Sequence, residues 1–231
     1  MKVLIVRAAE DAPRTAARLA AAGHQAIVAP VLTIRALDFV LPAGDFDAVL
    51  ATSAHAFQQV GRLSETTRLP LFVVGARTAE AAAAAGFAAA RVVAGNAGEL
   101  APAILNDMRP GARVLYLAGR DRKPDLEVAL AGRCALTIIE TYAADAAAAL
   151  PPEAVAAIAS GAVAVLHYSQ RSAAIFLDLA GRVGCDLKNR AIHHVAISDD
   201  AAKPLIAAGA PVAVAAQANE DSMIEELARP K

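Results

Sequence analysis

The sequence has no tryptophan, only two cysteines and few aromatic residues. Of its 231 residues, 4% are aromatic, whereas 57% are hydrophobic and many of these are alanine. Cys134 and Cys185 are too few for a disulfide framework, and neither belongs to a spacing of metal ligands. The composition is typical of a helix-rich globular protein with an ample core, and the length suits two domains of about 100 residues each.

The chain also lacks a charge imbalance and a long apolar run. Its 22 Lys and Arg residues nearly balance 23 Asp and Glu, and the formal net charge is −1. No general attraction to nucleic acid or to a membrane surface is therefore expected, and an acidic ligand must be met by local groups. No uncharged apolar stretch reaches membrane-spanning length, and the opening MKVLIVRAAED does not read as a signal peptide. We expect a soluble, cytoplasmic protein.

Motifs of cofactor binding and of nucleophilic catalysis are missing as well. No G-x-G-x-x-G follows the first expected strand, and no G-x-x-x-x-G-K-[ST] occurs, which argues against a nucleotide-dependent enzyme. We find no convincing Ser/His/Asp, Cys/His or metal-ligand constellation. The sequence therefore predicts neither a cofactor nor a metal.

What the chain does contain is a regular alternation of short apolar runs and alanine-rich helical segments. Lys2–Val6 predicts a strand, followed by a helix over Asp11–Ala22 with Asp11 as its N-cap. Asp47–Ala51 predicts another strand, and Thr52 opens a helix that we expect to reach Val60. Such alternation along the whole chain predicts an α/β fold with parallel sheets.

One turn has the features of an anion site. Leu71–Val74 is an apolar strand, Gly75 allows a sharp turn, and an alanine-rich helix runs on to Gly86. The start of such a helix presents backbone N–H groups and a positive dipole end, to which Arg77 and Thr78 add a cation and a hydroxyl. The same pattern fits an ordinary turn that binds nothing, because every α/β sheet contains such turns.

The chain repeats itself in two halves. Thr52-Ser53 follows one expected strand as Tyr168-Ser169 follows another, and Asn96 corresponds to Asn219 at an offset of 123 residues. Two related α/β units are therefore expected. Ligands of such chains usually bind at the carboxyl ends of the strands.

These motifs, in this order, resemble uroporphyrinogen-III synthase over nearly the whole chain, from Met1 to about Ala228. The matching segments are Val3-Leu4-Ile5-Val6-Arg7, Pro30-Val31-Leu32, Phe46-Asp47-Ala48-Val49-Leu50-Ala51-Thr52-Ser53, Val73-Val74-Gly75-Ala76-Arg77-Thr78-Ala79, Gly95-Asn96-Ala97 and Thr141-Tyr142. The resemblance implies two similar flavodoxin-like lobes, each a parallel sheet flanked by helices. The outer lobe would comprise residues 1–34 and 144–231, the inner lobe residues 38–140, and two extended connectors residues 31–37 and 140–145.

The implied reaction cyclises linear hydroxymethylbilane to uroporphyrinogen III, with loss of water and inversion of the last pyrrole ring. Because this substrate carries its own reactive groups and eight carboxylates, the protein must fold it, protonate a leaving hydroxyl and exclude water. The resemblance also implies a monomer, and allows a transient contact with the enzyme that produces the bilane. The competing interpretation is a non-catalytic bilobed binding or sensor protein for a small polyacid.

The resemblance also implies which residues act. Tyr142 would be the general acid, although an aromatic side chain that merely packs is the alternative. Arg7 is the expected cation of the outer lobe, because it ends the first strand. The full set of implied substrate contacts is Arg7, Thr52, Ser53, Gly75, Ala76, Arg77, Thr78, Gly95, Asn96, Gly119, Ser169, Gln170 and Ser198.

Three features depart from the family pattern. Ser198-Asp199-Asp200-Ala201 stands where the family has glycine and threonines, and two carboxylates there would repel an acidic ligand unless they cap a helix. Pro204 predicts that this helix starts later, near Lys203. His55 replaces an arginine of many relatives, and the pair at 193–194 is expected at the surface where a strand begins.

Overall fold

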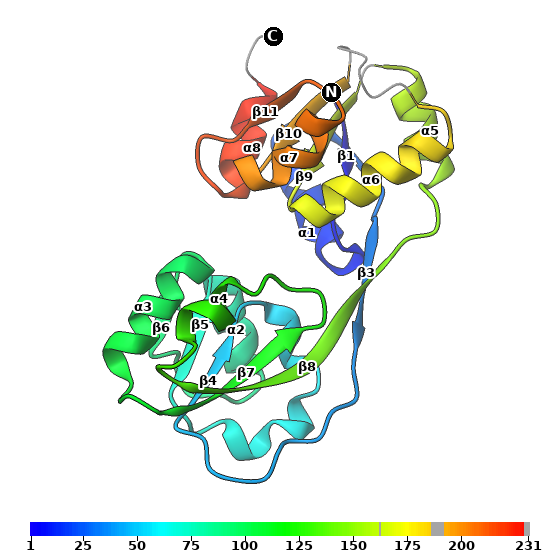
Figure 1. Cartoon of the computed structure of the whole chain (residues 1–231). Coiled ribbons are helices and arrows are strands. Elements are labelled where there is room, and N and C mark those ends of the chain that lie inside the picture. Colours follow the sequence, from blue (N-terminus) through cyan, green and yellow to red (C-terminus); the bar gives the residue numbers. More distant parts are fainter. Residues whose placement is uncertain (162, 186–191, 229–231) are drawn as a thin grey trace. The chain divides into compact units, whose positions relative to one another are not determined.

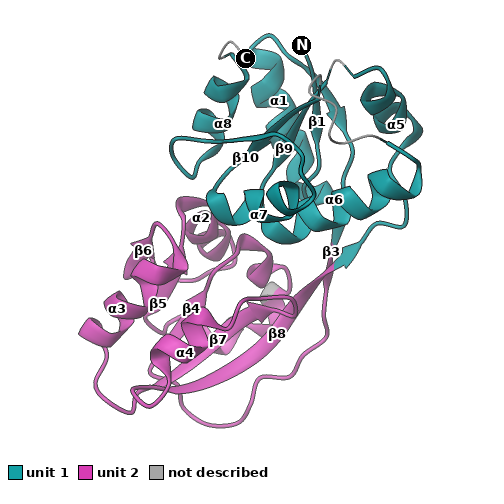
Figure 2. Ribbon diagram, turned by 45° about the horizontal axis from the view of Figure 1, so that its top comes forward, with its two compact units in different colours: residues 1–33, 145–231 teal, residues 34–144 magenta. Residues whose placement is uncertain are grey.

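The computed structural model describes residues 1–161, 163–185 and 192–228. The chain divides into two compact units, coloured separately in Figure 2. Unit 1 comprises Met1–Thr33 and Asp145–Lys231, and unit 2 comprises Ile34–Ala144. Unit 1 is thus discontinuous in sequence, and unit 2 is inserted into it.

Unit 1 is built on a parallel sheet of five strands in the order β11-β10-β9-β1-β2. The strands are β1 (Lys2–Ile5), β2 (Gln25–Val28), β9 (Val163–His167), β10 (Ile192–Ala196) and β11 (Val212–Val214). The helices are α1 (Ala12–Ala21), α5 (Pro152–Ala159), α6 (Gln170–Arg182), α7 (Asp199–Ala207) and α8 (Glu220–Leu227), with a 3-10 turn, η1, at Ala9–Asp11.

Helices cover this sheet on both faces, as Figure 1 shows. One face packs against α1 and α8, through Leu19 and Met223. On β1, an inner strand of this sheet, Val3, Leu4 and Ile5 are all fully buried. A strand with consecutive buried apolar residues must be covered on both sides, which is why β1 reads as an unbroken hydrophobic run.

Unit 2 is built on a sheet of six strands in the order β3-β8-β7-β4-β5-β6. The strands are β3 (Leu32–Ala36), β4 (Ala48–Ala51), β5 (Leu71–Val74), β6 (Val92–Ala94), β7 (Arg113–Gly119) and β8 (Ala135–Ala146), and those from β8 to β6 pair in parallel. The helices are α2 (Ala76–Ala84), α3 (Ala97–Asp107) and α4 (Asp125–Leu130), with 3-10 turns η2 (Ala54–Phe57), η3 (Val60–Arg62) and η4 (Ser64–Thr66).

The two faces of the unit 2 sheet have separate cores. On one face α2 and the 3-10 turns bury side chains such as Phe57 and Phe87. On the other face α3 and α4 pack Ile104 and Leu126 against the strands. The predicted α/β class, with two parallel sheets flanked by helices, is confirmed.

The two stretches expected as connectors are strands. β3 lies beside β8 at the edge of the unit 2 sheet, and β8 runs without interruption from Ala135 to Ala146. The division between the units falls at Thr33 and Asp145, within these two strands. Among the described residues, no helix has both the length and the hydropathy of a membrane span.

Several local predictions are wrong. The segment after Thr52 forms the 3-10 turn η2 rather than a helix that continues to Val60. Asp11 does occupy the predicted N-cap position of α1, but its side chain makes no capping hydrogen bond. Helix α7 begins at Asp199, capped by Ser198, so Pro204 lies inside it.

The pair at 193–194 lies near the start of a strand, as predicted, and His193 is half-buried, but His194 is not at the surface. His194 is fully buried on β10, and its Nδ1 lies 3.0 Å from Nε2 of the equally buried His167 on β9. β10 is an inner strand of the sheet, and every residue along it except His193 is buried. A buried imidazole needs a hydrogen-bond partner, and each of these two rings supplies one to the other.

Candidate functional site

The carboxyl edge of the unit 2 sheet brings together residues from three strands. Thr52 and Ser53 follow β4, Gly119 ends β7, and Tyr142 lies on β8 opposite Gly119. Because the carboxyl ends of parallel strands meet at one edge, residues far apart in sequence become neighbours there. Of the residues predicted from sequence, these four lie together at this edge.

The ring of Tyr142 lies directly on the backbone of Gly119. A Cβ atom built on Gly119 would be 2.6 Å from Cζ of Tyr142 and 2.8 Å from its hydroxyl oxygen. Contacts this short do not occur for real Cβ atoms, so only glycine at position 119 allows the ring to take this place. The strand register is also irregular between Ala118 and Gly119, where the pairing with β8 shifts.

The phenol of Tyr142 is partly buried among polar neighbours. Burial raises the pKa of Tyr142, and a hydrogen bond with the Ser53 side chain partly opposes that rise. The His55 ring lies 5.7 Å from the Tyr142 ring, centroid to centroid. At neutral pH the phenol is therefore protonated and can donate a hydrogen bond or a proton.

Ser53 fixes the local backbone as well as contacting Tyr142. Its hydroxyl oxygen accepts a hydrogen bond of 3.3 Å from the backbone N–H of His55, so Ser53 is the N-cap of η2. A serine that caps a helical turn holds its side chain in one orientation. The capping interaction thus sets where the Ser53 hydroxyl meets Tyr142.

A second tyrosine, Tyr116, belongs to this site but was not predicted from the sequence. Its hydroxyl lies 3.1 Å from Oγ1 of Thr52, and only 3% of the residue is exposed. Burial raises the pKa of Tyr116. The sequence signal was a single phenol in the aliphatic run Val114–Ala118, but its partner is 64 residues away and could not be read locally.

An arginine on the loop after β7 supports the Gly119 turn. Nη1 of Arg122 donates a 3.1 Å hydrogen bond to the carbonyl oxygen of Gly119. Its Nε donates to Glu127 at 2.6 Å, and Nη1 lies 3.5 Å from Glu140. The neighbouring Arg120 pairs with Glu140 at 3.0 Å. These arginines tie the β7 loop to β8, the strand that carries Tyr142.

The turn between β5 and α2 has the geometry expected of an anion site. Gly75 adopts φ of +78°, a conformation that favours glycine, although a Cβ there would meet nothing within 4 Å. Helix α2 has no side-chain cap, and Ala76 and Arg77 are exposed at its start. Thr78 is buried, so the exposed groups of this turn are main-chain amides and the Arg77 guanidinium.

The next turn along the edge is closed by a capping box. The Asn96 side chain accepts a 3.0 Å hydrogen bond from the backbone N–H of Glu99. The Glu99 carboxylate reaches back to the N–H of Gly95 at 2.9 Å and to Nδ2 of Asn96 at 2.7 Å. Gly95 and Asn96 therefore use these groups to start helix α3, as a capping box does.

In unit 1 the predicted serines start helices. Ser169 accepts from the N–H of Ser172 at 3.1 Å and caps α6, and Ser198 accepts from Ala201 at 3.4 Å and caps α7. Ser169 and Gln170 are exposed at the carboxyl edge of that sheet.

The two acidic residues after Ser198 lie in the first turn of α7. There, carboxylates interact favourably with the helix dipole. The Asp200 carboxylate also accepts a 3.0 Å hydrogen bond from Lys203, in an i,i+3 ion pair.

Arg7 lies at the carboxyl end of β1, but its guanidinium is occupied within unit 1. It pairs with Asp11 at 3.1 Å and with Glu220 at 3.2 Å, and its guanidinium carbon lies 4.2 Å from the centroid of the Tyr168 ring. Only 12% of the Arg7 side chain is exposed. Within the described part of the chain, no group of three His, Cys, Asp or Glu residues could hold a metal ion.

Comparisons with known proteins identify one family. The family model for uroporphyrinogen-III synthase HemD matches residues 13–225. Among solved structures, uroporphyrinogen-III synthetase from Helicobacter pylori is similar with a TM-score of 0.70 and 15% identity, over 98% of this chain and 97% of that chain. A mutant uroporphyrinogen III synthase from Thermus thermophilus is similar with a TM-score of 0.56 and 18% identity, again over 98% and 97%. Comparison with curated protein sequences gave no match.

At these sequence identities the solved structures establish only the shared fold. The assignment to a family rests on the family model, which covers most of the sequence. The resemblance predicted from the sequence motifs is confirmed. The chain belongs to the uroporphyrinogen-III synthase family.

Proposed function

We propose that Tyr142 is the general acid for the reaction of this family, the cyclisation of hydroxymethylbilane to uroporphyrinogen III. The observation that carries this assignment is the position of its phenol, partly buried on Gly119 and next to Ser53 and His55. A general acid must be protonated and held in place near the leaving group. The raised pKa of Tyr142 and its contacts with Ser53 meet both needs.

The first step breaks the bond between the hydroxymethyl carbon and its oxygen. The Tyr142 phenol gives its proton to the leaving hydroxyl, which departs as water, and the pyrrole nitrogen lone pair stabilises the resulting azafulvenium cation. The Tyr142 phenolate then lies close to that cation, and its negative charge stabilises it.

Ring closure follows on the substrate itself. The substituted carbon of the last pyrrole ring attacks the electrophilic carbon to give a spiro species, which fragments and recloses with that ring inverted. The final loss of a proton from carbon returns a proton to Tyr142, so the net change is loss of one water. The protein needs no nucleophile of its own for this sequence.

The substrate carboxylates are assigned to the helix starts along the two sheet edges. In unit 2 the uncapped first turn of α2 offers amides at Ala76 and Arg77, with the Arg77 guanidinium beside them. In unit 1 the first turn of α6 follows Ser169 and Gln170, and that of α7 follows Ser198. Helix N-termini favour anions through their N–H groups and dipole. The remaining predicted contacts would shape the substrate along the edge of the unit 2 sheet: Thr52, Ser53, Gly75, Thr78, Gly95, Asn96 and Gly119.

We further propose that the protein acts as a cytoplasmic monomer and receives its substrate through at most a transient contact with the enzyme that produces the bilane. Gel filtration combined with light scattering, at the concentrations used for the assay, tests the monomer.

The isomer of the product tests the proposed function. The purified protein is incubated with hydroxymethylbilane, and the oxidised products are separated into type I and type III. An active synthase yields the type III ring, whereas unassisted closure yields type I. A protein that binds the bilane and leaves only type I product would be a binding or sensor protein, and the proposal would fail.

A further inference from the structure

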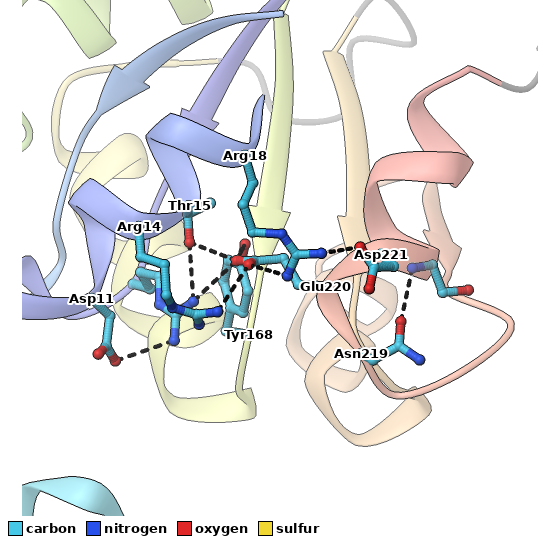
Figure 3. A network of polar contacts seen from close by, with 10 residues as sticks. Asp11, Arg14, Thr15, Arg18, Tyr168, Asn219, Glu220 and Asp221 are labelled. Carbon is cyan, nitrogen blue, oxygen red and sulfur yellow. Dashed lines mark hydrogen bonds and ion pairs between the residues drawn. The ribbon is translucent and has the colours of Figure 1, made fainter. Parts of the chain in front are cut away.

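A nearly buried carboxylate, Glu220, lies at the centre of a polar cluster in unit 1. Its exposed fraction is 7%, and Figure 3 shows the side chains that surround it. Glu220 accepts hydrogen bonds from Thr15 at 2.6 Å and from the Tyr168 hydroxyl at 2.8 Å. Three arginines complete the set: Arg18 at 2.8 Å, Arg7 at 3.2 Å and Arg14 at 3.4 Å.

The cluster is balanced in charge and keeps Glu220 ionised. Burial acts to raise the pKa of Glu220, but the hydrogen bonds from Thr15 and Tyr168 and the charges of Arg14 and Arg7 outweigh it, and the pKa lies below its ordinary value. The arginines also have other acidic partners: Asp11 pairs with Arg7, and Asp221 pairs with Arg18. A cluster with balanced charges does not attract a polyacid from a distance.

Glu220 joins three chain segments that are distant in sequence. It begins helix α8, Thr15 belongs to α1, and Tyr168 lies between β9 and the start of α6. Tyr168 is also covered by Arg7, whose guanidinium carbon lies 4.2 Å from the ring centroid. The residue that directly follows Tyr168 is Ser169, the cap of α6.

A buried ion network contributes little net stability, because desolvation of the charges cancels much of their attraction. Its effect here is to fix the side chain of Tyr168, and with it the chain that leads into α6. We propose that Glu220 is a positioning residue for substrate binding, which holds Tyr168 and Arg7 and thereby sets the first turn of α6 for a substrate carboxylate. This inference rests on the proposed function, since it deepens the role of Ser169 and Gln170.

Glu220 can act on substrate binding through its charge or through positioning, and its substitution changes KM in opposite directions in the two cases. Glu220→Gln removes a negative charge, so a purely electrostatic role would strengthen the binding of a polyacid and lower KM. Loss of positioning would raise KM instead. Tyr168→Phe removes one hydroxyl from the cluster and changes no charge, so it isolates positioning. Asp221→Asn is the matched control, because it removes a neighbouring charge from an acid whose side chain is 77% exposed.

The experiment measures KM and kcat for conversion of hydroxymethylbilane to the type III product, with thermal unfolding of each variant. We expect Glu220→Gln and Tyr168→Phe to raise KM about tenfold, the effect of losing a hydrogen bond to a charged group, with kcat within about twofold. Asp221→Asn should keep or slightly lower KM. If Glu220→Gln does not fold, the KM of Tyr168→Phe alone tests the inference.

An unchanged KM in Tyr168→Phe, or a lower KM in Glu220→Gln, would overturn the inference, as would a loss of thermal stability without a change in KM. Failure of the proposed function is a different result, because the wild-type protein would then form no type III product.

Discussion

The contact between Gly119 and Tyr142 leads to a sharp prediction for Gly119→Ala. The new methyl group would lie 2.6 Å from Cζ of Tyr142, whereas ordinary van der Waals contact begins at 3.4 Å. The ring must therefore retreat by roughly 0.8 Å, or the β7 strand must move by as much. A displacement of about 1 Å in a catalytic group can cost about a hundredfold in rate. We expect kcat to fall about 10- to 100-fold and the free energy of unfolding to fall by about 1–3 kcal/mol, the usual cost of overpacking.

The assay measures kcat from the initial rate of type III formation at saturating hydroxymethylbilane, and the free energy of unfolding from urea titration. Gly61→Ala is the matched control in unit 2, because a Cβ at Gly61 would meet nothing within 4 Å and its φ is not positive. It should leave both quantities unchanged. A second test combines Gly119→Ala with Tyr142→Ala, in which the ring that causes the clash is gone.

In the Tyr142→Ala background the added methyl group should cost little stability. The double-mutant cycle should therefore give a coupling free energy of about 1 kcal/mol or more between the two substitutions. Wild-type kcat in Gly119→Ala would refute the reasoning, because the ring would then work equally well from another place. Additive losses of stability would refute it too, since they would mean that the methyl group clashes with something other than Tyr142.

Three further predictions concern Tyr142, Tyr116 and the hydrogen-bonded histidines His167 and His194. Tyr142→Phe should lower kcat on the order of tenfold to a thousandfold, the contribution of one general acid, and an unchanged kcat would remove Tyr142 from the mechanism. Tyr116→Phe keeps the buried ring but loses the bond to Thr52, so kcat/KM should fall about three- to tenfold, with about 1 kcal/mol less stability in urea titration; no effect on kcat/KM would make the pair purely structural. Burial, and then the neighbouring His194, lower the pKa of His167 well below 6.5. The unfolded chain therefore takes up the proton first, and the free energy of unfolding should be constant just above pH 6.5 and should fall below it by up to about 1.4 kcal/mol per pH unit. Urea titrations between pH 7.5 and 5.5 measure this, and a flat profile would contradict it.

Much of the fold could be predicted because short apolar runs alternate with helical segments and end at turn or capping residues such as glycine and serine. Leu71–Val74 followed by Gly75 is one such case, and both the strand and the turn lie where the sequence placed them. The start of α7 could not be found this way. Pro204 suggested a late start, but the Ser198 cap and the acidic first turn stabilise an earlier one, and the helix accommodates proline in its second turn.

The partners of polar side chains were beyond prediction because they lie far away in sequence. Arg7 was correctly placed at the end of β1, yet its partner Glu220 is 213 residues further on. A local pattern shows that an arginine ends a strand, but it cannot show whether a carboxylate from another helix already occupies it. His194 is a similar case, since its partner His167 lies on a neighbouring strand, 27 residues away.

The sequence repeat acquires a physical meaning from these contacts. Ser53 and Ser169 are equivalent in the two halves, and each caps the helical segment that follows a central strand. The residue before each serine is held by a buried partner: the Thr52 hydroxyl meets Tyr116, and the Tyr168 hydroxyl meets Glu220. A cap fixes the backbone of a turn, whereas a hydrogen bond from the preceding side chain fixes the direction in which the chain arrives at it. Both units therefore hold the turn after a central strand in the same two ways.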